Sequence, residues 1–237
     1  MLHGRKVIGI VPTAPLLMET ENRYDDKYMF TDTYEVRVAE AGMIPVGVLP
    51  VEGRIRTDVL ELCDAFVVQG GTHVRPYHID VIDHAVKTGK KLLGICLGCQ
   101  AIQCYFATAA EAEKRQWEGN MGSLFAILRK TENTVFLKPV EGHRLSEIVP
   151  REDTSALKHK VLLSEGSLAA KVFGLTSLMG VSLHSFCIDE PAPGLAVSGR
   201  AEDGTVEAVE HGDRILGTQF HPDADGELPM VFAWLAK

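Results

Sequence analysis

Residues 91–100, KLLGICLGCQ, decide the fold, because an apolar run ends there at Cys96, between Gly94 and Gly98. A strand that ends in G-x-C-x-G and turns directly into a helix is typical of a nucleophile elbow, whose strained turn leaves little room for neighbouring side chains. A helix starting at Leu97 would aim its N-terminal amides at the Cys96 sulfur and favour the thiolate. The pattern predicts that Cys96 is a nucleophile.

The same stretch also reads as a redox motif, since Cys96 and Cys99 have the C-x-x-C spacing of a dithiol. A dithiol does not need the paired glycines, so we favour the elbow. Cys99 is then expected to be a packing residue that could still be an oxidation partner of Cys96. The chain has five cysteines at irregular spacing, which fits reduced thiols better than a disulfide framework.

Strand-like and helix-like segments alternate along the N-terminal half. Apolar β-type runs predict strands, and segments with helical spacing separate them. This order predicts an α/β fold with a mostly parallel, flavodoxin-like sheet and helices on both of its faces. Such a sheet places its functional site at the carboxyl ends of the strands. The expected strands are 6–12, 43–50, 64–71 and 91–96, and the expected helices are 28–42, 57–62 and 75–89.

The second half is less regular, and we expect it to complete a single domain over residues 1–237. Three β-type runs between 194 and 222 are separated by the turn signals EDG and HGD, which predict an antiparallel extension of the sheet. Other expected elements are a helix at 123–130, a strand at 133–140 and a closing helix after Gly226.

A nucleophilic cysteine needs a base and a group that orients the base. His221 ends a strand-like run, and Asp223 follows two residues later, where an extended segment would place both side chains on one face. The amide of Leu97 and that of Gly71, in a glycine pair after the third strand, could form an oxyanion hole. These residues predict a Cys-His-Asp site.

Composition excludes several classes of function. A net charge of −8 and a pI near 5.6 give no basic surface for nucleic acid. The N-terminus lacks the pattern of a signal peptide, and no apolar stretch approaches the ~20 residues that span a bilayer. We therefore expect a cytoplasmic protein with no membrane or nucleic-acid partner, no cofactor and no metal site.

The segments QGG (69–71), GICLGCQ (94–100) and TQFHPD (218–223), in that order, resemble the class I glutamine amidotransferase-like family. The segments KVIGIVPTAP (6–15) and VVQGGTHVRPYH (67–78) resemble its γ-glutamyl-γ-aminobutyrate hydrolase branch. In that family a cysteine attacks a γ-glutamyl amide, releases the amine or ammonia, and leaves a glutamyl thioester that water hydrolyses. The resemblance implies Cys96 as nucleophile, His221 as base and Asp223 as acid, with substrate contacts from Gly70, Gln100, His184 and Ser185.

The chain also departs from the family pattern. Asp223 stands where the family usually has Glu, and Leu97 stands where the hydrolase branch commonly has Arg. GVSLHSF (180–186) matches the branch motif V-N-S-x-H-H-Q only at Ser182 and His184. Three functions stay open: a stand-alone hydrolase of a small γ-glutamyl substrate, a glutaminase subunit with a synthase partner, and a non-catalytic binding relative. A homo-oligomer is also compatible with the sequence.

Overall fold

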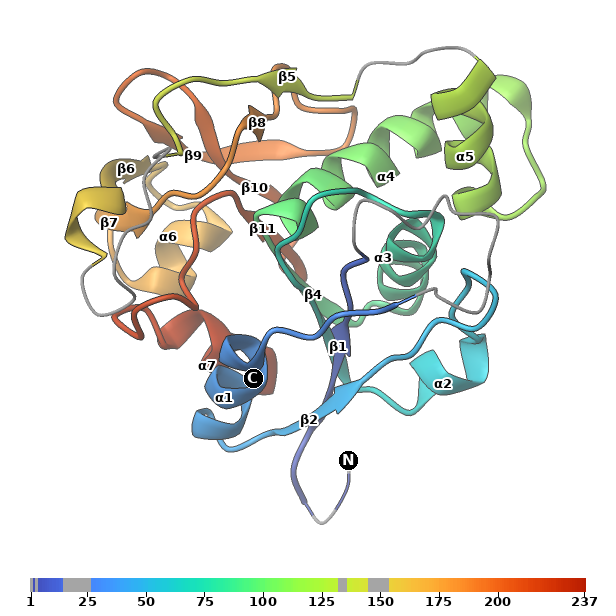
Figure 1. Cartoon of the computed structure of the whole chain (residues 1–237), viewed down its shortest axis with the longest axis horizontal. Helices are drawn as coiled ribbons and strands as arrows, with labels where there is room; N and C mark the ends of the chain where they lie inside the picture. Colours follow the sequence, from blue (N-terminus) through green and yellow to red (C-terminus); the bar gives the residue numbers. More distant parts are fainter. Residues whose placement is uncertain (1, 3, 15–26, 132–135, 145–153) are drawn as a thin grey trace.

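A twisted sheet forms the centre of the molecule, in the strand order β2-β1-β3-β4-β11-β10-β9-β6-β7 (Figure 1). The computed structural model describes residues 2, 4–14, 27–131, 136–144 and 154–237. The first five strands in this order are parallel, and most of their residues are buried apolar side chains, as expected of a sheet covered on both faces. These strands are β1 (Val7–Val11), β2 (Ile44–Gly47), β3 (Ala65–Val68), β4 (Lys91–Ile95) and β11 (Ile215–Thr218).

The predicted helices of the N-terminal half are confirmed, and each lies between the strands that the sequence indicates. Pro76 begins α3, and Gly89 ends it in a left-handed conformation that glycine adopts without strain. The helix predicted to begin at Leu97 is confirmed, and it continues to Arg115. The helices are α1 (Asp32–Glu40), α2 (Thr57–Glu61), α3 (Pro76–Thr88), α4 (Leu97–Arg115) and α5 (Met121–Thr131).

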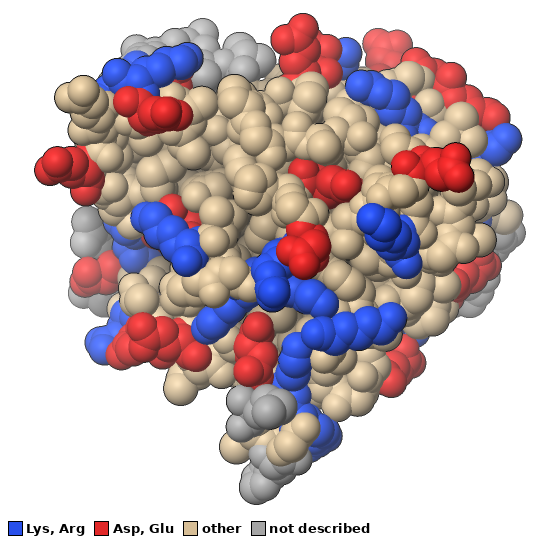
Figure 2. Space-filling view, turned by 180° about the vertical axis from the view of Figure 1, so that it is seen from behind, with Lys and Arg blue, Asp and Glu red and all other residues tan. Residues whose placement is uncertain are grey.

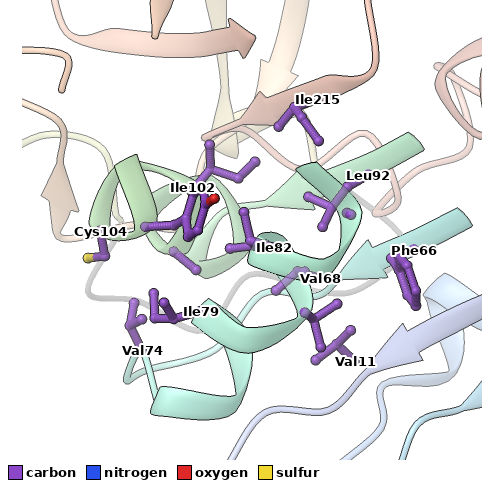
Figure 3. Packing of buried hydrophobic residues seen from close by; sticks show 14 of the residues in the cluster. Val11, Phe66, Val68, Val74, Ile79, Ile82, Leu92, Ile102, Cys104 and Ile215 are labelled. Atoms are coloured by element: carbon purple, nitrogen blue, oxygen red, sulfur yellow. The ribbon is translucent and has the colours of Figure 1, made fainter. Parts of the chain in front are cut away.

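Two hydrophobic clusters hold the layers together, one on each face of the sheet. Phe66 and Leu92 point to the face covered by α3 and α4, where they pack with Ile82 and Ile102 (Figure 3). Their neighbours in sequence point to the opposite face, where α1 and the last helix, α7 (Met230–Ala236), cover them. The side-chain alternation of the strands therefore builds both cores.

The second half extends the sheet with antiparallel strands, as predicted, but with two differences. The third expected run, β11, pairs in parallel with β4 and so belongs to the parallel part. The strand expected at 133–140 is wrong in extent: the described part contains only β5 (Lys138–Pro139), paired with β8 (Phe186–Cys187), and 133–135 lie outside the described residues. The extension consists of β10 (Val206–His211), β9 (Ala196–Ala201), β6 (Lys158–Leu163) and β7 (Ser177–Val181), with α6 (Leu168–Phe173) between β6 and β7.

The sequence analysis did not predict β6, α6 or β7. Along β6, buried side chains alternate with partly or fully exposed ones, so the strand carries only a weak apolar pattern. The face in Figure 2 shows acidic and basic side chains interspersed, with no broad basic surface on that side. No helix in the described part of the chain is long and apolar enough to cross a membrane.

Candidate active site

Cys96 lies between β4 and α4 with φ 53° and ψ −103°, a strained conformation for a residue other than glycine. The two glycines around it are required by packing. A Cβ at Gly94 would lie 2.5 Å from the backbone of Gly98, and a Cβ at Gly98 would collide with the carbonyl of Val68. The cysteine therefore occupies a tight strand-to-helix turn of the kind that the sequence predicts.

His221 and Asp223 follow β11, the strand beside β4, so the topology brings them to Cys96. The backbone amide of His221 donates to the carbonyl of Val181 (2.8 Å). The imidazole Nδ1 of His221 donates to Asp223 Oδ1 (3.2 Å). Cys96 lies close enough to the imidazole for its sulfur to raise the pKa of His221. The shorter acid thus reaches the imidazole without the extra methylene of glutamate.

Helix α1 holds the acid from the opposite side. Thr33 Oγ1 donates to Asp223 Oδ2 (3.2 Å), and Tyr34 is close enough for the Asp223 charge to help raise the pKa of its buried hydroxyl. Arg37 Nε donates to the backbone carbonyl of Asp223 (3.2 Å). Sequence reasoning missed these three residues, since only a contact between α1 and a segment nearly 190 residues later reveals them. An amphipathic pattern alone carries no signal for such a contact.

The protonation states follow from this arrangement. Burial opposes a charge on His221, but Asp223 and the Cys96 sulfur raise the pKa of the imidazole well above its usual value. Burial likewise opposes the charge of Asp223, yet His221 lowers the pKa of that carboxyl. An imidazole that keeps its proton beside Cys96 suits the acid and base role that a nucleophilic cysteine needs.

The glycine pair after β3 borders the elbow. A Cβ at Gly70 would lie 3.0 Å from the His221 ring and 3.5 Å from Cys96 Cβ. The Gly70 amide donates to the Tyr34 hydroxyl (2.9 Å). Gly71 is exposed and packs beside the Leu97 side chain, whose own amide is the first of α4 and has no acceptor within the helix.

The remaining predicted contacts divide into buried and exposed groups. Gln100 Nε2 donates to the carbonyl of Phe186 (3.0 Å) and to Gln219 Oε1 (3.2 Å), so its own carbonyl oxygen is the part left for a ligand. His184 is buried and Ser185 is exposed.

A pocket of about 270 Å³ opens beside the start of α4. Leu97, Gln100 and Phe186 line it on the side of the elbow, and Arg129 contributes a cation. Cys96 is 6% exposed and borders this pocket without lining it.

Cys99 lies in the first turn of α4 and is fully buried. Burial, with a smaller effect of Glu207, raises the pKa of its thiol well above the usual value. A Cβ at Gly217 would lie 3.0 Å from the Cys99 sulfur, so the thiol packs against β11. It is a free thiol in this structure, like Cys96.

Comparison with known proteins places this geometry in a family. A model of the Peptidase C26 family matches residues 77–223, more than half of the chain. A glutamine amidotransferase-like protein of Lactococcus lactis is 24% identical over 243 residues, covering 93% of this chain and 92% of its own. A candidate glutamine amidotransferase of Schizosaccharomyces pombe is 27% identical over 213 residues, which cover 81% of this chain and 73% of the relative.

Solved structures show the same fold. The glutaminase domain of CTPS from Trypanosoma brucei, with bound acivicin, superposes with a TM-score of 0.63 at 16% identity, over 97% of this chain and 92% of that domain. A candidate GMP synthase component from Thermoplasma acidophilum gives a TM-score of 0.57 at 17% identity, over 98% and 94% of the two chains. The chain therefore belongs to the Peptidase C26 family, with the class I glutamine amidotransferase-like fold.

Proposed function

We propose that the protein is a cysteine hydrolase that cleaves a γ-glutamyl amide bond through a glutamyl thioester. One observation carries the proposal: Cys96 stands at φ 53° at the start of α4, and Gly70 separates it narrowly from the His221 imidazole, which Asp223 orients from 3.2 Å. Thiolate, base and orienting acid are thus within reach of one another, as nucleophilic catalysis requires. The amide hydrolases and amidotransferases of the family agree with this reaction type.

The proposed reaction has two halves. The Cys96 thiolate attacks the γ-carbonyl carbon, and the amide N–H groups of Leu97 and Gly71 stabilise the oxyanion. The C–N bond breaks as protonated His221 gives its proton to the leaving amine. The glutamyl group then remains on Cys96 as a thioester. Neutral His221 then takes a proton from water, the water oxygen attacks the thioester carbon, and glutamate departs as the sulfur returns to the thiolate.

The pocket beside α4 suits the glutamyl portion of such a substrate. Arg129 supplies a cation for the α-carboxylate, and the free carbonyl oxygen of Gln100 can accept from the α-ammonium. We assign Gly70, His184 and Ser185 to the wall of the site around the glutamyl portion of the substrate. The leaving amine would extend away from this pocket, past Gly71, which is exposed.

Turnover of a chromogenic γ-glutamyl anilide tests the proposal. Wild-type protein should release the anilide catalytically, and Cys96→Ser should not. Asp225→Asn is a matched control, because Asp225 is an acid of the same loop that pairs with Lys158 (2.9 Å) and not with His221. A wild-type protein that turns over neither the anilide nor glutamine, with or without a synthase, would contradict the proposal and favour a non-catalytic binding protein.

A second candidate function is that of a glutaminase subunit, because the solved structures of similar fold include the glutaminase domain of one synthase and a component of another. A glutaminase subunit would pass ammonia to a partner and be nearly idle alone. Free glutamine and γ-glutamyl amines separate the two functions. The hydrolase should turn over at least one γ-glutamyl amine rapidly without any partner, whereas the subunit should hydrolyse only glutamine, and slowly.

A further inference from the structure

A second group of titratable side chains lies in the antiparallel extension, away from Cys96. Glu207, on β10, is completely buried, and three imidazoles face one of its oxygens. His143 Nδ1 is 3.2 Å from Glu207 Oε1, and His159 Nε2 and His184 Nε2 are each 3.3 Å from the same atom. The proposed reaction uses neither Glu207, His143 nor His159.

Two of the imidazoles point lone pairs at this carboxylate. His184 Nδ1 lies 3.1 Å from the carbonyl of Phe186, which can only accept, so Nδ1 carries the proton. His143 Nε2 lies 2.9 Å from Asp203 Oδ2 and must donate to it. In their neutral forms, both rings therefore present the unprotonated nitrogen to an anion, which is repulsive.

No neighbouring group in the described part of the chain relieves this repulsion. The Ser182 hydroxyl has one proton, and it goes to the carbonyl of His143 at 2.7 Å rather than to Nδ1 at 3.4 Å. Among the described residues, neither carboxylate oxygen of Glu207 receives a hydrogen bond of ordinary geometry, and the facing nitrogens of His159 and His184 have none either. A buried anion without donors is costly.

Two carboxylates lie against the His143 ring, Glu207 Oε1 at 3.2 Å from Nδ1 and Asp203 Oδ2 at 2.9 Å from Nε2. A cation held between Glu207 and the imidazoles facing it would offset this arrangement of acceptors.

We propose that His143, His159 and Glu207 bind a divalent transition-metal ion, best matched by zinc. The ligand atoms of these three residues all lie within 4.8 Å of one another. A tetrahedral zinc site with bonds near 2.05 Å has ligand atoms about 3.3 Å apart, close to the 3.2 and 3.3 Å between the imidazole nitrogens and Glu207. Imidazole ligands favour zinc over magnesium or calcium. The site revises the expectation of no metal.

The surroundings resemble the outer partners of a metal centre. Metal-bound imidazoles usually donate their other N–H to a carboxylate or a carbonyl, as His143 does to Asp203. The three ligands lie in the antiparallel extension and not beside Cys96, so the ion would be structural. It would fix His143, whose carbonyl accepts from the His184 amide (3.1 Å) in the segment that ends at Phe186. The Phe186 carbonyl accepts from Gln100, and the Phe186 side chain lines the pocket.

Cobalt(II) titration of protein first dialysed against a chelator, followed by zinc competition, tests the site. Wild type should bind one cobalt per chain with the intense visible bands of tetrahedral coordination, and zinc should displace it. His159→Asn should weaken binding by at least ~100-fold, and Asp203→Asn, which removes an outer partner, by about 10- to 100-fold. His159 is 24% exposed, so its loss should leave the fold intact.

His211→Asn is the matched control, because His211 lies on β10, the strand of Glu207, but its Nδ1 contacts the carbonyl of Gly194 and not Glu207. It should bind cobalt like wild type. Wild-type protein that binds no cobalt or zinc would overturn the proposal and indicate a protonated ion network. Unchanged affinity in His159→Asn would overturn it equally.

Discussion

Asp223 and Glu207 are both buried carboxylates that face imidazoles, but their surroundings differ. Asp223 receives hydrogen bonds from Thr33 and His221, both at 3.2 Å. Glu207 has three imidazoles at 3.2 to 3.3 Å and, among the described residues, no hydrogen bond of ordinary geometry. The first carboxylate is satisfied by the protein and can orient a base. The Glu207 carboxylate and its imidazoles instead surround a position where a bound cation would give them a partner.

The difference follows the two halves of the sheet. Parallel strands bring their carboxyl ends to one edge, where Cys96 and His221 meet after β4 and β11. Antiparallel strands bring side chains of distant segments to one face, where β6 supplies His159 and β10 supplies Glu207. Substitutions at each carboxylate and its neighbours should therefore have separable effects on turnover and on stability.

The largest effect is expected at the nucleophile. Cys96→Ser should lower turnover by ~10⁴-fold or more, because a hydroxyl at this position is far less acidic than a thiol. Cys99→Ser should keep most of the activity, since Cys99 packs against β11 and has no part in the triad. Anilide hydrolysis by both variants checks this. Equal loss in the two, with a disulfide in oxidised wild type, would establish a dithiol mechanism instead.

The next effect is expected at Asp223. Asp223→Asn should reduce turnover by up to ~10⁴-fold with the fold retained, because an amide would favour the wrong tautomer of His221. The melting temperature and kcat of this variant would be measured beside those of Asp225→Asn. Hydrolysis at the wild-type rate in Asp223→Asn would show that another group orients the imidazole.

A smaller effect is expected at Tyr34, which we regard as a positioning residue. Tyr34→Phe removes the acceptor of the Gly70 amide, so unfolding should require about 1–3 kcal/mol less free energy. The acidic limb of the profile of kcat against pH should also shift, because the Tyr34 hydroxyl and the Asp223 carboxylate influence each other electrostatically. Denaturant titration and the pH profile check both effects. A shift in stability alone would reduce Tyr34 to a structural role.

The smallest effect is expected at Asp203, whose side chain is 53% exposed. Its pKa is lowered to about 2 from an unfolded value of about 3.9, so its contribution to stability is present above pH 4 and is lost as the pH falls towards 2. Solvent screening limits this contribution to less than about 1 kcal/mol. In metal-free protein, Asp203→Asn should flatten the dependence of unfolding free energy on pH below 4. A steeper dependence would contradict the assignment.

The sequence predicted the parallel half of the fold well, because buried strands and capped helices leave strong local patterns. The elbow at Cys96 was predictable for the same reason, since Gly94 and Gly98 are close in sequence to the residue that they accommodate. His221 and Asp223 lie two residues apart, so their contact could be proposed from an extended backbone. The roles of these residues in catalysis stay predictions.

The rest depends on contacts between distant segments. Tyr34 meets Asp223 only because α1 packs beside the end of β11, and no local pattern marks that contact. The imidazoles around Glu207 come from segments spread over about forty residues, from His143 to His184, with spacings unlike any short metal-binding motif. β6 and β7 have exposed positions among buried ones, so their apolar pattern was too weak to predict the strands.

Covalent labelling by a glutamine analogue with an electrophilic carbon tests most directly the claim that Cys96 is a thiolate activated by His221. Peptide mapping by mass spectrometry should find one label per chain, on Cys96, and His221→Asn should slow labelling by at least ~100-fold. Cys99 should remain unlabelled, because it is fully buried. A label on Cys99, or labelling of Cys96 at the same rate without His221, would contradict the claim.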